Sequence, residues 1–489
     1  MGKNEPYRRR GEIRSLAAHF WRQTRSLRWP FWAANIMEMI ERLAYYGVRV
    51  VIPVYIAQAD EIGGLHFSQA DKGFIFMWWA LVQSILAVFT GGFADRYGYK
   101  KQIAVAIVLK SAGYLIMATQ RDFWPFFTGC MVLASGTAIF KPPVQGTFVR
   151  TLDEESSGIG WGYFYMVVNI GGFLGPPLAH FLYGYSWPAV FFGCAALVCV
   201  NLLWLFSYRD AGGAPGPLTG FIDVVKLTFR QIMNFRLVLF ILIVSVFWAS
   251  FTQLFDMLPN FIVDWVDSAS LARHLPRFMH STASSGGPRI AQEWVINFNP
   301  LLIIVLVAPL SWLVNRKMHR LASIGIGMSI ASCGMLIIGS SVSIYACLAG
   351  IAFFSIGEML SSPKMSEYLG VIAPREQKAL YMGYSNIPFA IGWGYGSYAG
   401  GQFYGSSGEK AALALRYLGE HLHISKLPPR TEAFEVLCAT LSQSHDSATG
   451  LLWNTYHPGH VWLPFATAGF AAAAAVIVYH HYFNKIRLD

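Results

Sequence analysis

The chain has 489 residues, of which 54% are hydrophobic and only 13% are charged. Soluble proteins carry about 25% charged residues, so this composition excludes an ordinary soluble domain and indicates a polytopic membrane protein. The net charge of +10 comes mostly from basic residues in short loops. Such loops are typical of the cytoplasmic side of membrane proteins, so they indicate membrane orientation and not nucleic-acid binding.

Taken in order, the chain begins with a basic segment, 1–29, which predicts either a helix on the membrane surface or a disordered tail. A polar linker at 209–235 divides the remainder into two parts, and residues 484–489 form a short tail. We therefore predict an all-α integral membrane protein with two six-helix bundles, 30–208 and 236–483. Its twelve expected spans are the long apolar runs at 30–57, 72–94, 102–120, 124–149, 158–184, 187–207, 237–264, 297–315, 320–341, 343–371, 379–405 and 459–483.

The basic loops all fall on one side if every span crosses, which predicts that both termini are cytoplasmic. Two insertions, 266–294 and 406–458, then lie outside the cytoplasm. The second insertion has helical periodicity at Glu409–His421 and Thr431–Ser442, so we expect a helical hairpin there. Five of the six cysteines lie in apolar runs, which argues against a disulfide framework.

The first span carries an unusual charged face. Glu38, Glu41, Arg42 and Tyr45 follow the spacing i, i+3, i+4, i+7 and therefore share one side of the helix. Ionisable residues inside a membrane helix normally pair with one another and mark a substrate or proton pathway. Lys141 in the fourth span lies at a matching depth, so we expect it to meet Glu38 or Glu41; the alternative is a lysine that extends to the interface.

Three later spans also carry polar residues. Asn169 lies at lipid depth in the fifth span and needs a partner, which is either another helix or a substrate. Asn299 precedes a proline, a pattern typical of a helix N-cap. Glu358 lies near the middle of the tenth span, where an isolated acid indicates a functional role. Lys364 and Glu367 have the spacing of a surface ion pair.

Several of these motifs resemble one family. Asn35–Gly47, N-I-M-E-M-I-E-R-L-A-Y-Y-G, resembles the E-x-x-E-R-F-x-Y-Y-G signature of the proton-coupled oligopeptide transporters, a branch of the major facilitator superfamily, with Leu43 in place of Phe. Further motifs similar to this family are G-T-A-I-F-K-P-P (136–143), Y-F-Y-M-V-V-N-I-G-G (163–172), the Phe-Trp pair that precedes Gln253, the Asn-Pro pair at Asn299 and the Glu-to-Pro spacing at Glu358. The loop G-G-F-A-D-R-Y-G-Y-K-K (91–101) resembles the G-x-x-x-D-R-x-G-R-R pattern of the superfamily as a whole.

The resemblance implies the major facilitator fold and a proton-driven symporter that imports di- and tripeptides. Arg42 and Lys141 would hold the substrate carboxylate and Glu358 its ammonium group. The proton would load Glu38 or Glu41, with Lys141 as the coupling partner. The implied substrate-binding residues are Arg42, Tyr45, Tyr46, Lys141, Asn169, Gln253, Asn299 and Glu358.

Other functions stay open at this point. The chain could transport another amphoteric solute, or sense a nutrient without transporting it. A membrane-embedded enzyme is disfavoured because the sequence offers neither a nucleophile–base pair nor metal-ligand spacing. We expect no metal and no cofactor beyond the proton. The expected partners are a small peptide and the lipid bilayer, with no nucleic acid, and we expect a monomer in a bacterial inner membrane.

Overall fold

The structure, a computed structural model, describes residues 21–153, 156–209, 234–281, 287–372 and 384–485. The regular elements in these residues are helices, accompanied by two isolated β-bridges. The expected all-α class is therefore confirmed. Predictions that concern 1–20 and most of the linker and the C-terminal tail lie outside the described residues, and the domain boundaries stay a prediction.

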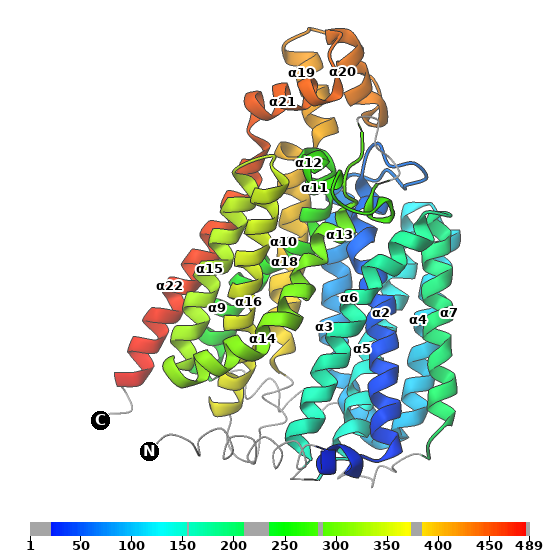
Figure 1. Ribbon diagram of the computed structural model, residues 1–489, viewed down its shortest axis with the longest axis vertical. Coiled ribbons are helices and arrows are strands. Elements are labelled where there is room, and N and C mark those ends of the chain that lie inside the picture. Colours follow the sequence, from blue (N-terminus) through cyan, green and yellow to red (C-terminus); the bar gives the residue numbers. More distant parts are fainter. Residues whose placement is uncertain (1–20, 154–155, 210–233, 282–286, 373–383, 486–489) are drawn as a thin grey trace, which may run out of the picture.

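The first six long helices form what we call the N-terminal group, on the right of Figure 1. They pack around one apolar core, to which Phe31, Ile103, Phe140 and Val190 contribute fully buried side chains. Charged side chains are buried beside this core on the first helix, and they provide the polar site described below. The members of the group are α2 (Trp29–Ala57), α3 (Gln69–Tyr97), α4 (Tyr99–Thr119), α5 (Phe123–Val149), α6 (Ser157–Tyr183) and α7 (Trp187–Phe206).

The remaining long helices form the C-terminal group, with a separate apolar core. The seventh expected span is not one helix but three, because it breaks at Thr252 and again at Met257. Pro259 lies in the first turn after the second break, where its missing N–H costs nothing. The members are α9 (Phe235–Phe251), α10 (Gln253–Asp256), α11 (Leu258–Trp265), α14 (Phe298–Lys317), α15 (Arg320–Gly339), α16 (Ile344–Ile372), α18 (Asn386–Ser407) and α22 (Leu463–Lys485).

Each expected span corresponds to a described helix or, for the seventh, to a broken one. Eight segments of the described chain are long and apolar enough by themselves to cross a membrane, and they lie in α3, α4, α5, α7, α9–α10, α15, α16 and α22 with its preceding turn. The α2 helix is not among them because it carries four charged residues, and α6 and α18 are rich in glycine. An apolar helical stretch also covers Gln292–Val307.

Two helices from different groups, α3 and α18, pack through glycines. A Cβ atom added to Gly73 would lie 2.7 Å from the Ser397 carbonyl oxygen, and one added to Gly401 would lie 2.4 Å from that of Gln69. Neither distance leaves room for a side chain, so the two backbones are in direct contact. We call this contact the glycine seam.

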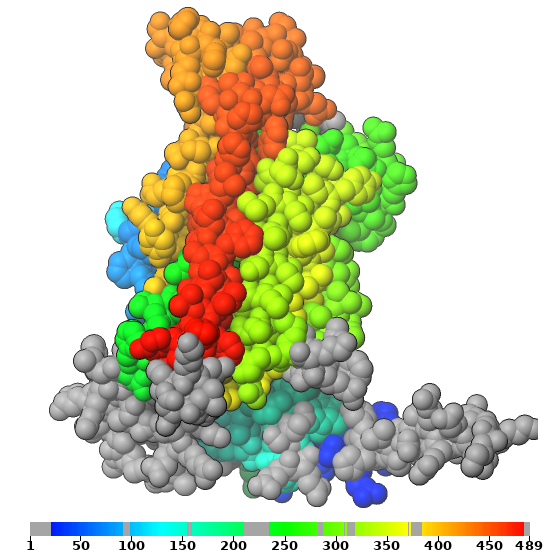
Figure 2. Space-filling view, turned by 90° about the vertical axis from the view of Figure 1, so that its left-hand side faces the viewer, coloured from blue at the N-terminus to red at the C-terminus, as the bar shows by residue number. Residues whose placement is uncertain are grey.

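The second insertion forms a compact unit, residues 409–462, that we call the cap (Figures 1 and 2). Both predicted helices are confirmed, as α19 (Lys410–Glu420) and α20 (Ala433–Leu441). The predicted hairpin is incomplete, because a third helix, α21 (His445–Tyr456), completes the cap. The Ser444 hydroxyl caps α21 by accepting from the Ser447 amide at 3.3 Å. The cap contains two further 3-10 turns, η3 (Arg430–Glu432) and η4 (Pro458–Trp462).

The first insertion lies beside the cap and contributes α12 (Ala269–Ala272), η1 (Arg277–Met279) and α13 (Gln292–Ile296). We call this side of the molecule the cap end. The opposite side, where α2 begins and α22 stops, is the terminal end (Figure 1). The expected Lys364–Glu367 pair is confirmed there at 2.6 Å, and Glu367 also pairs with Arg320.

Orientation is tested by an accessible thiol in the cap. Ser444 is exposed at the cap end, and the basic loops predict that this end faces outward. In a background without native cysteines, Ser444→Cys is expected to react with an impermeant maleimide in intact cells. The matched control is Arg209→Cys after α7 at the terminal end, which should react only after lysis. The opposite labelling pattern would place the termini outside.

Candidate functional site

A cavity of about 250 Å³ lies between the two groups of helices. It receives side chains from α2, α6, α9, α14, α16 and α18, so residues more than 300 positions apart in the chain meet there. Five of the eight expected substrate-binding residues line it: Tyr45, Tyr46, Asn169, Asn299 and Glu358. The rest of the wall is largely aromatic and includes Trp248, Phe251, Phe255, Phe389 and Trp393.

Glu358 is held at this cavity by Asn299. The Asn299 amide nitrogen donates to Glu358 Oε2 at 3.0 Å and to the Ser355 hydroxyl at 2.9 Å. The prediction that Asn299 caps a helix is therefore wrong, because α14 begins one residue earlier and the side chain reaches across to α16. None of the described cations lies within 4 Å of the Glu358 carboxylate. The acid is thus oriented by a neutral donor and, among the residues that the structure describes, has no cationic partner.

A second polar cluster surrounds the two α2 carboxylates. Arg42 Nε lies 3.3 Å from Glu38, and Arg42 Nη2 lies 2.5 Å from Glu41. Glu41 also pairs with Lys110 from α4, whose ammonium group donates to the Thr137 hydroxyl at 3.1 Å. The Lys110 and Glu41 side chains are completely buried. Sequence reasoning missed Lys110, although a lone lysine in the apolar 102–120 run was a usable signal.

The expected contact of Lys141 with the α2 carboxylates is not formed. The side chain of Lys141 is exposed, and no ion pair within 4 Å joins it to Glu38 or Glu41. Lys141 acts on Glu38 only through its electrostatic field. The depth argument was insufficient because it fixed the height of the lysine and not the face of α5 on which it lies. Lys110 contacts Glu41 instead. Its side chain passes close to Gly136, where an added Cβ atom would lie 2.6 Å from Lys110 Cγ.

Two further expected residues lie outside the cavity lining. The buried Gln253 amide donates to the carbonyl oxygens of Ala249 and Gly396, each at 2.9 Å, and thereby joins α10 to α18. That contact is an interhelical bond, and it does not place Gln253 at the cavity. Arg42 is likewise not part of the lining, and both of its ion pairs are with carboxylates of its own helix.

The cavity contains a cation that sequence reasoning also missed. Arg49 lines it, pairs with Asp256 and donates to the Phe255 carbonyl oxygen at 3.3 Å. Lys72 donates to the Asp256 carbonyl oxygen at 2.8 Å and to the Asn260 side chain at 2.7 Å. Arg49 stands seven residues after Arg42 and so shares its helical face, a signal that was available in the sequence. These contacts join the two groups on the cap side of the cavity.

The cap adds a second set of contacts between the groups. Arg430 pairs with Glu409 at 2.7 Å and also donates to the carbonyl oxygens of Ala57 at 2.8 Å and Phe67 at 3.0 Å. Gln69 donates to the same Glu409 carboxylate at 3.1 Å. Burial raises the pKa of Glu409 to about 7. Arg430 therefore ties the cap, which belongs to the C-terminal half of the chain, onto the N-terminal group.

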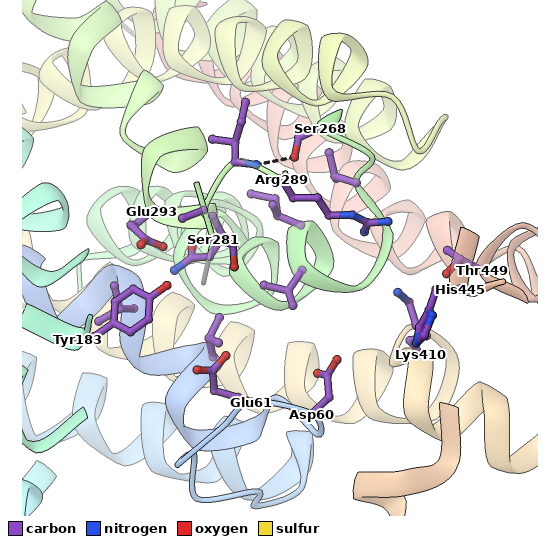
Figure 3. Close-up of a pocket in the computed structure, with 18 of the residues that line it drawn as sticks. Asp60, Glu61, Tyr183, Ser268, Ser281, Arg289, Glu293, Lys410, His445 and Thr449 are labelled. Atoms are coloured by element: carbon purple, nitrogen blue, oxygen red, sulfur yellow. Dashed lines mark hydrogen bonds between the residues drawn. The ribbon is translucent and has the colours of Figure 1, made fainter. Parts of the chain in front are cut away.

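A smaller polar pocket of about 130 Å³ lies beneath the cap (Figure 3). Asp60, Glu61 and Glu293 line one side of it, while Lys410 and His445 lie on the other side in Figure 3. The Trp187 indole donates to Glu61 at 3.1 Å, and burial raises the pKa of Glu61 to about 7. Each of these charged groups already interacts with a neighbouring residue of the protein. The pocket is therefore part of the packing at the closed cap end.

The sequence model of the Major Facilitator Superfamily matches residues 35–397. The chain belongs to this superfamily. Among similar curated proteins is the multidrug resistance protein MdtH of Edwardsiella ictaluri, 23% identical over 367 residues, which cover 74% of this chain and 84% of the relative. MdtH of Escherichia coli K12 is 24% identical over 388 residues, covering 77% of this chain and 88% of the relative.

Solved structures of peptide transporters share the fold of this major facilitator protein. A peptide transporter POT in complex with sulfate aligns with a TM-score of 0.66 at 16% identity, covering 94% of this chain and 94% of the other. A POT family transporter in complex with 5-aminolevulinic acid aligns with a TM-score of 0.61 at 17% identity, covering 87% and 96%. The predicted fold is therefore confirmed.

Within this superfamily fold, the contacts described between the two groups concentrate at the cap end. Besides Arg49 and Arg430, they include a pair between His180 and Glu293 and a hydrogen bond of 2.8 Å from Gln58 to Asp264. Charged and polar groups that are buried together hold this side shut, since separating them would expose unpaired charges. The arrangement corresponds to a transporter that is closed on the cap side of its central cavity.

Proposed function

We propose that the protein is a proton-coupled symporter that imports di- and tripeptides or similar zwitterions by alternating access. The observation that carries the proposal is Glu358. This acid lines a cavity between the two groups and is oriented by Asn299. It forms no ion pair with a cation of the described residues, which suits an incoming ammonium group. The fold likeness to peptide transporters supports the choice of substrate.

The N-terminal group offers cations for the other end of such a substrate. Arg49 lines the cavity, while Arg42 and Lys141 lie nearer the terminal end and keep their proposed role toward the carboxylate. Arg42 and Arg49 are separated by about 10 Å along α2, at about 1.5 Å per residue. A dipeptide spans about 7 Å, at about 3.5 Å per residue. A zwitterion held by Glu358 therefore draws a cation of the N-terminal group toward the C-terminal group.

The proton would load the α2 carboxylate cluster, which is buried and shares its helix with the cavity residues Tyr45 and Tyr46. The volume also favours a small solute, because pockets for drug-sized ligands start at about 300 Å³ and this cavity measures about 250 Å³. A monomer in a bacterial inner membrane with cytoplasmic termini completes the proposal.

A second candidate is proton-driven efflux of apolar cations. Two observations favour it: the aromatic wall formed by residues such as Trp248 and Trp393, and the sequence similarity to proteins named for multidrug resistance. Aromatic rings attract cations through their faces, and an acid such as Glu358 would add to that attraction.

Proteoliposomes separate the two candidates. With an inside-alkaline pH gradient, labelled alanyl-alanine is expected to accumulate, and a protonophore should abolish the accumulation. Unlabelled dipeptide trapped inside should drive counterflow without a gradient. If alanyl-alanine shows neither behaviour while the same gradient moves ethidium, the efflux candidate replaces the peptide symporter.

A further inference from the structure

Lys110 differs from Arg42 in that it contacts the α2 carboxylates from another helix and is completely buried. Its ammonium group meets one oxygen of Glu41, and its side chain is completely buried. The other Glu41 oxygen lies 2.5 Å from Arg42. Both oxygens of Glu41 therefore face a cation, and one of these cations lies too deep to reach water without a movement of α4.

Glu38 is in the opposite situation. Its nearest charged contact is Arg42 Nε at 3.3 Å, and its second oxygen is buried without a hydrogen-bond partner. An unpartnered oxygen on a buried carboxylate is costly when the group is ionised, and protonation removes most of that cost. Glu38 also lies within the field of Lys141, which is exposed. Glu41 Oε2 also lacks a hydrogen-bond partner, but the Arg42 cation lies 2.5 Å from it, whereas the Arg42 contact of Glu38 is made by Oε1. Glu38 Oε2 is therefore the oxygen that is free to take a proton.

We propose that Lys110 is the fixed counter-ion of Glu41, a positioning residue that keeps Glu41 ionised and leaves the exchangeable proton to Glu38. This inference rests on the proposed proton-coupled function and divides the two acids between a structural and a coupling role. The only covalent event is the transfer of a proton from water to a Glu38 oxygen and its later return to water. No other bond forms or breaks.

The charge count explains how this proton would matter to a substrate. With both acids ionised, Glu38, Glu41, Arg42 and Lys110 sum to zero. A proton on Glu38 raises the sum to +1 while Lys110 still neutralises Glu41. The charge released is that of Arg42, which then favours a substrate carboxylate on the open side. Without Lys110, Arg42 would instead remain bound to Glu41, and the proton would release nothing.

In the part of the chain that the structure describes, Glu41 and Glu38 are the acids that act on Lys110. From α2 it faces Glu41, the ring of Tyr45 at 5.9 Å and, further away, Glu38 and Arg42. From α7 it faces Cys194, and from α5 it faces Thr137 and the ring of Phe140 at 5.8 Å, neither of which titrates. A change in pH that reaches Lys110 therefore acts through the two α2 carboxylates.

The test uses the purified full-length protein and two readouts. Lys110→Gln leaves Glu41 without its fixed cation, so its melting temperature should fall at neutral pH and recover as the pH is lowered and Glu41 takes up a proton. Lys110→Arg should restore the wild-type profile. Lys101→Gln, the matched control, replaces an exposed lysine on the same helix and should leave the melting profile unchanged. These measurements need no transport, so they remain informative if peptide uptake is never observed.

The double variant Lys110→Gln/Glu41→Gln decides between the two acids. It removes the cation and the anion together, so both the melting profile and gradient-driven accumulation of alanyl-alanine should return to within about threefold of wild type. Glu38→Gln should lose gradient-driven accumulation at least tenfold while retaining counterflow. The inference is overturned if the double variant retains counterflow without gradient-driven accumulation, or if Lys110→Gln melts like wild type at every pH.

Discussion

Replacing Glu358 by glutamine is expected to weaken the binding of peptides with a free amino terminus by about 10- to 150-fold. The substitution keeps the shape and the hydrogen bond from Asn299 but removes the charge that an ammonium group would meet. A hydrogen bond to a charged group contributes about 1.5–3 kcal/mol, and about 1.4 kcal/mol corresponds to a factor of ten in affinity.

An N-acetylated peptide tests which end of the substrate is involved. Acetylation already removes the ammonium charge, so Glu358→Gln should barely change the weaker binding of that ligand. The matched control is Glu367→Gln on the same helix, since this exposed acid pairs with Arg320 and Lys364 at the terminal end. Binding is measured by the thermal shift of the purified variants. Equal weakening of free and acetylated peptide would remove Glu358 from the ammonium site.

Replacing Arg430 by alanine is expected to open the cap end. The change removes two hydrogen bonds between the cap and the N-terminal group, to the carbonyl oxygens of Ala57 and Phe67, and one hydrogen bond to Glu409 within the cap. Water compensates for part of the lost hydrogen bonds, so we take the net loss as that of one charged hydrogen bond, about 2 kcal/mol. A loss of this size raises the population of molecules that are open at the cap end about 30-fold. The readout is Val54→Cys, a position that lines the pocket beneath the cap and is only 5% exposed. In a background without native cysteines, its reaction with an impermeant maleimide added from the cap side should accelerate accordingly.

The cap itself offers the matched control. Arg416→Ala removes another arginine whose partner, Glu420 at 2.8 Å, lies within the cap. This variant should leave the Val54→Cys reaction rate unchanged. Equal acceleration in both variants would mean that Arg430 acts by stabilising the cap and not by tying it to α2 and α3.

The sequence was sufficient for features that depend on one helix at a time. The span positions and the charged face of α2 follow from hydropathy and from the 3.6-residue period, and both agree with the structure. The third cap helix was missed because it is weakly amphipathic, although Ser444 and Asp446 were available as start signals. The broken seventh span was missed because composition alone does not distinguish a break from a continuous apolar helix.

Contacts between helices were harder to predict. Depth along the membrane placed Lys141 level with Glu38, but the rotation of α5 and the close approach of α4 at Gly136 decide which lysine reaches the acids. Gln253 and Asn299 were recognised as polar residues in apolar helices, yet their partners on α18 and α16 depend on packing that no single helix encodes. A single sequence predicts which residues need partners and leaves the choice of partner to the assembled fold.

The glycine seam between α3 and α18 determines which movements of the two groups of helices have a low free-energy cost. Interlocked side chains would have to leave their rotamer wells before two helices could turn against each other. Gly73 and Gly401 have no side chains to interlock, so the backbones that meet there can pivot with little change in contact. The seam joins the two halves without a bond that must break, unlike the ion pairs at Arg49 and Arg430. The seam is thus a pivot about which the two groups of helices can rotate while the ion pairs and hydrogen bonds at the cap end form and break.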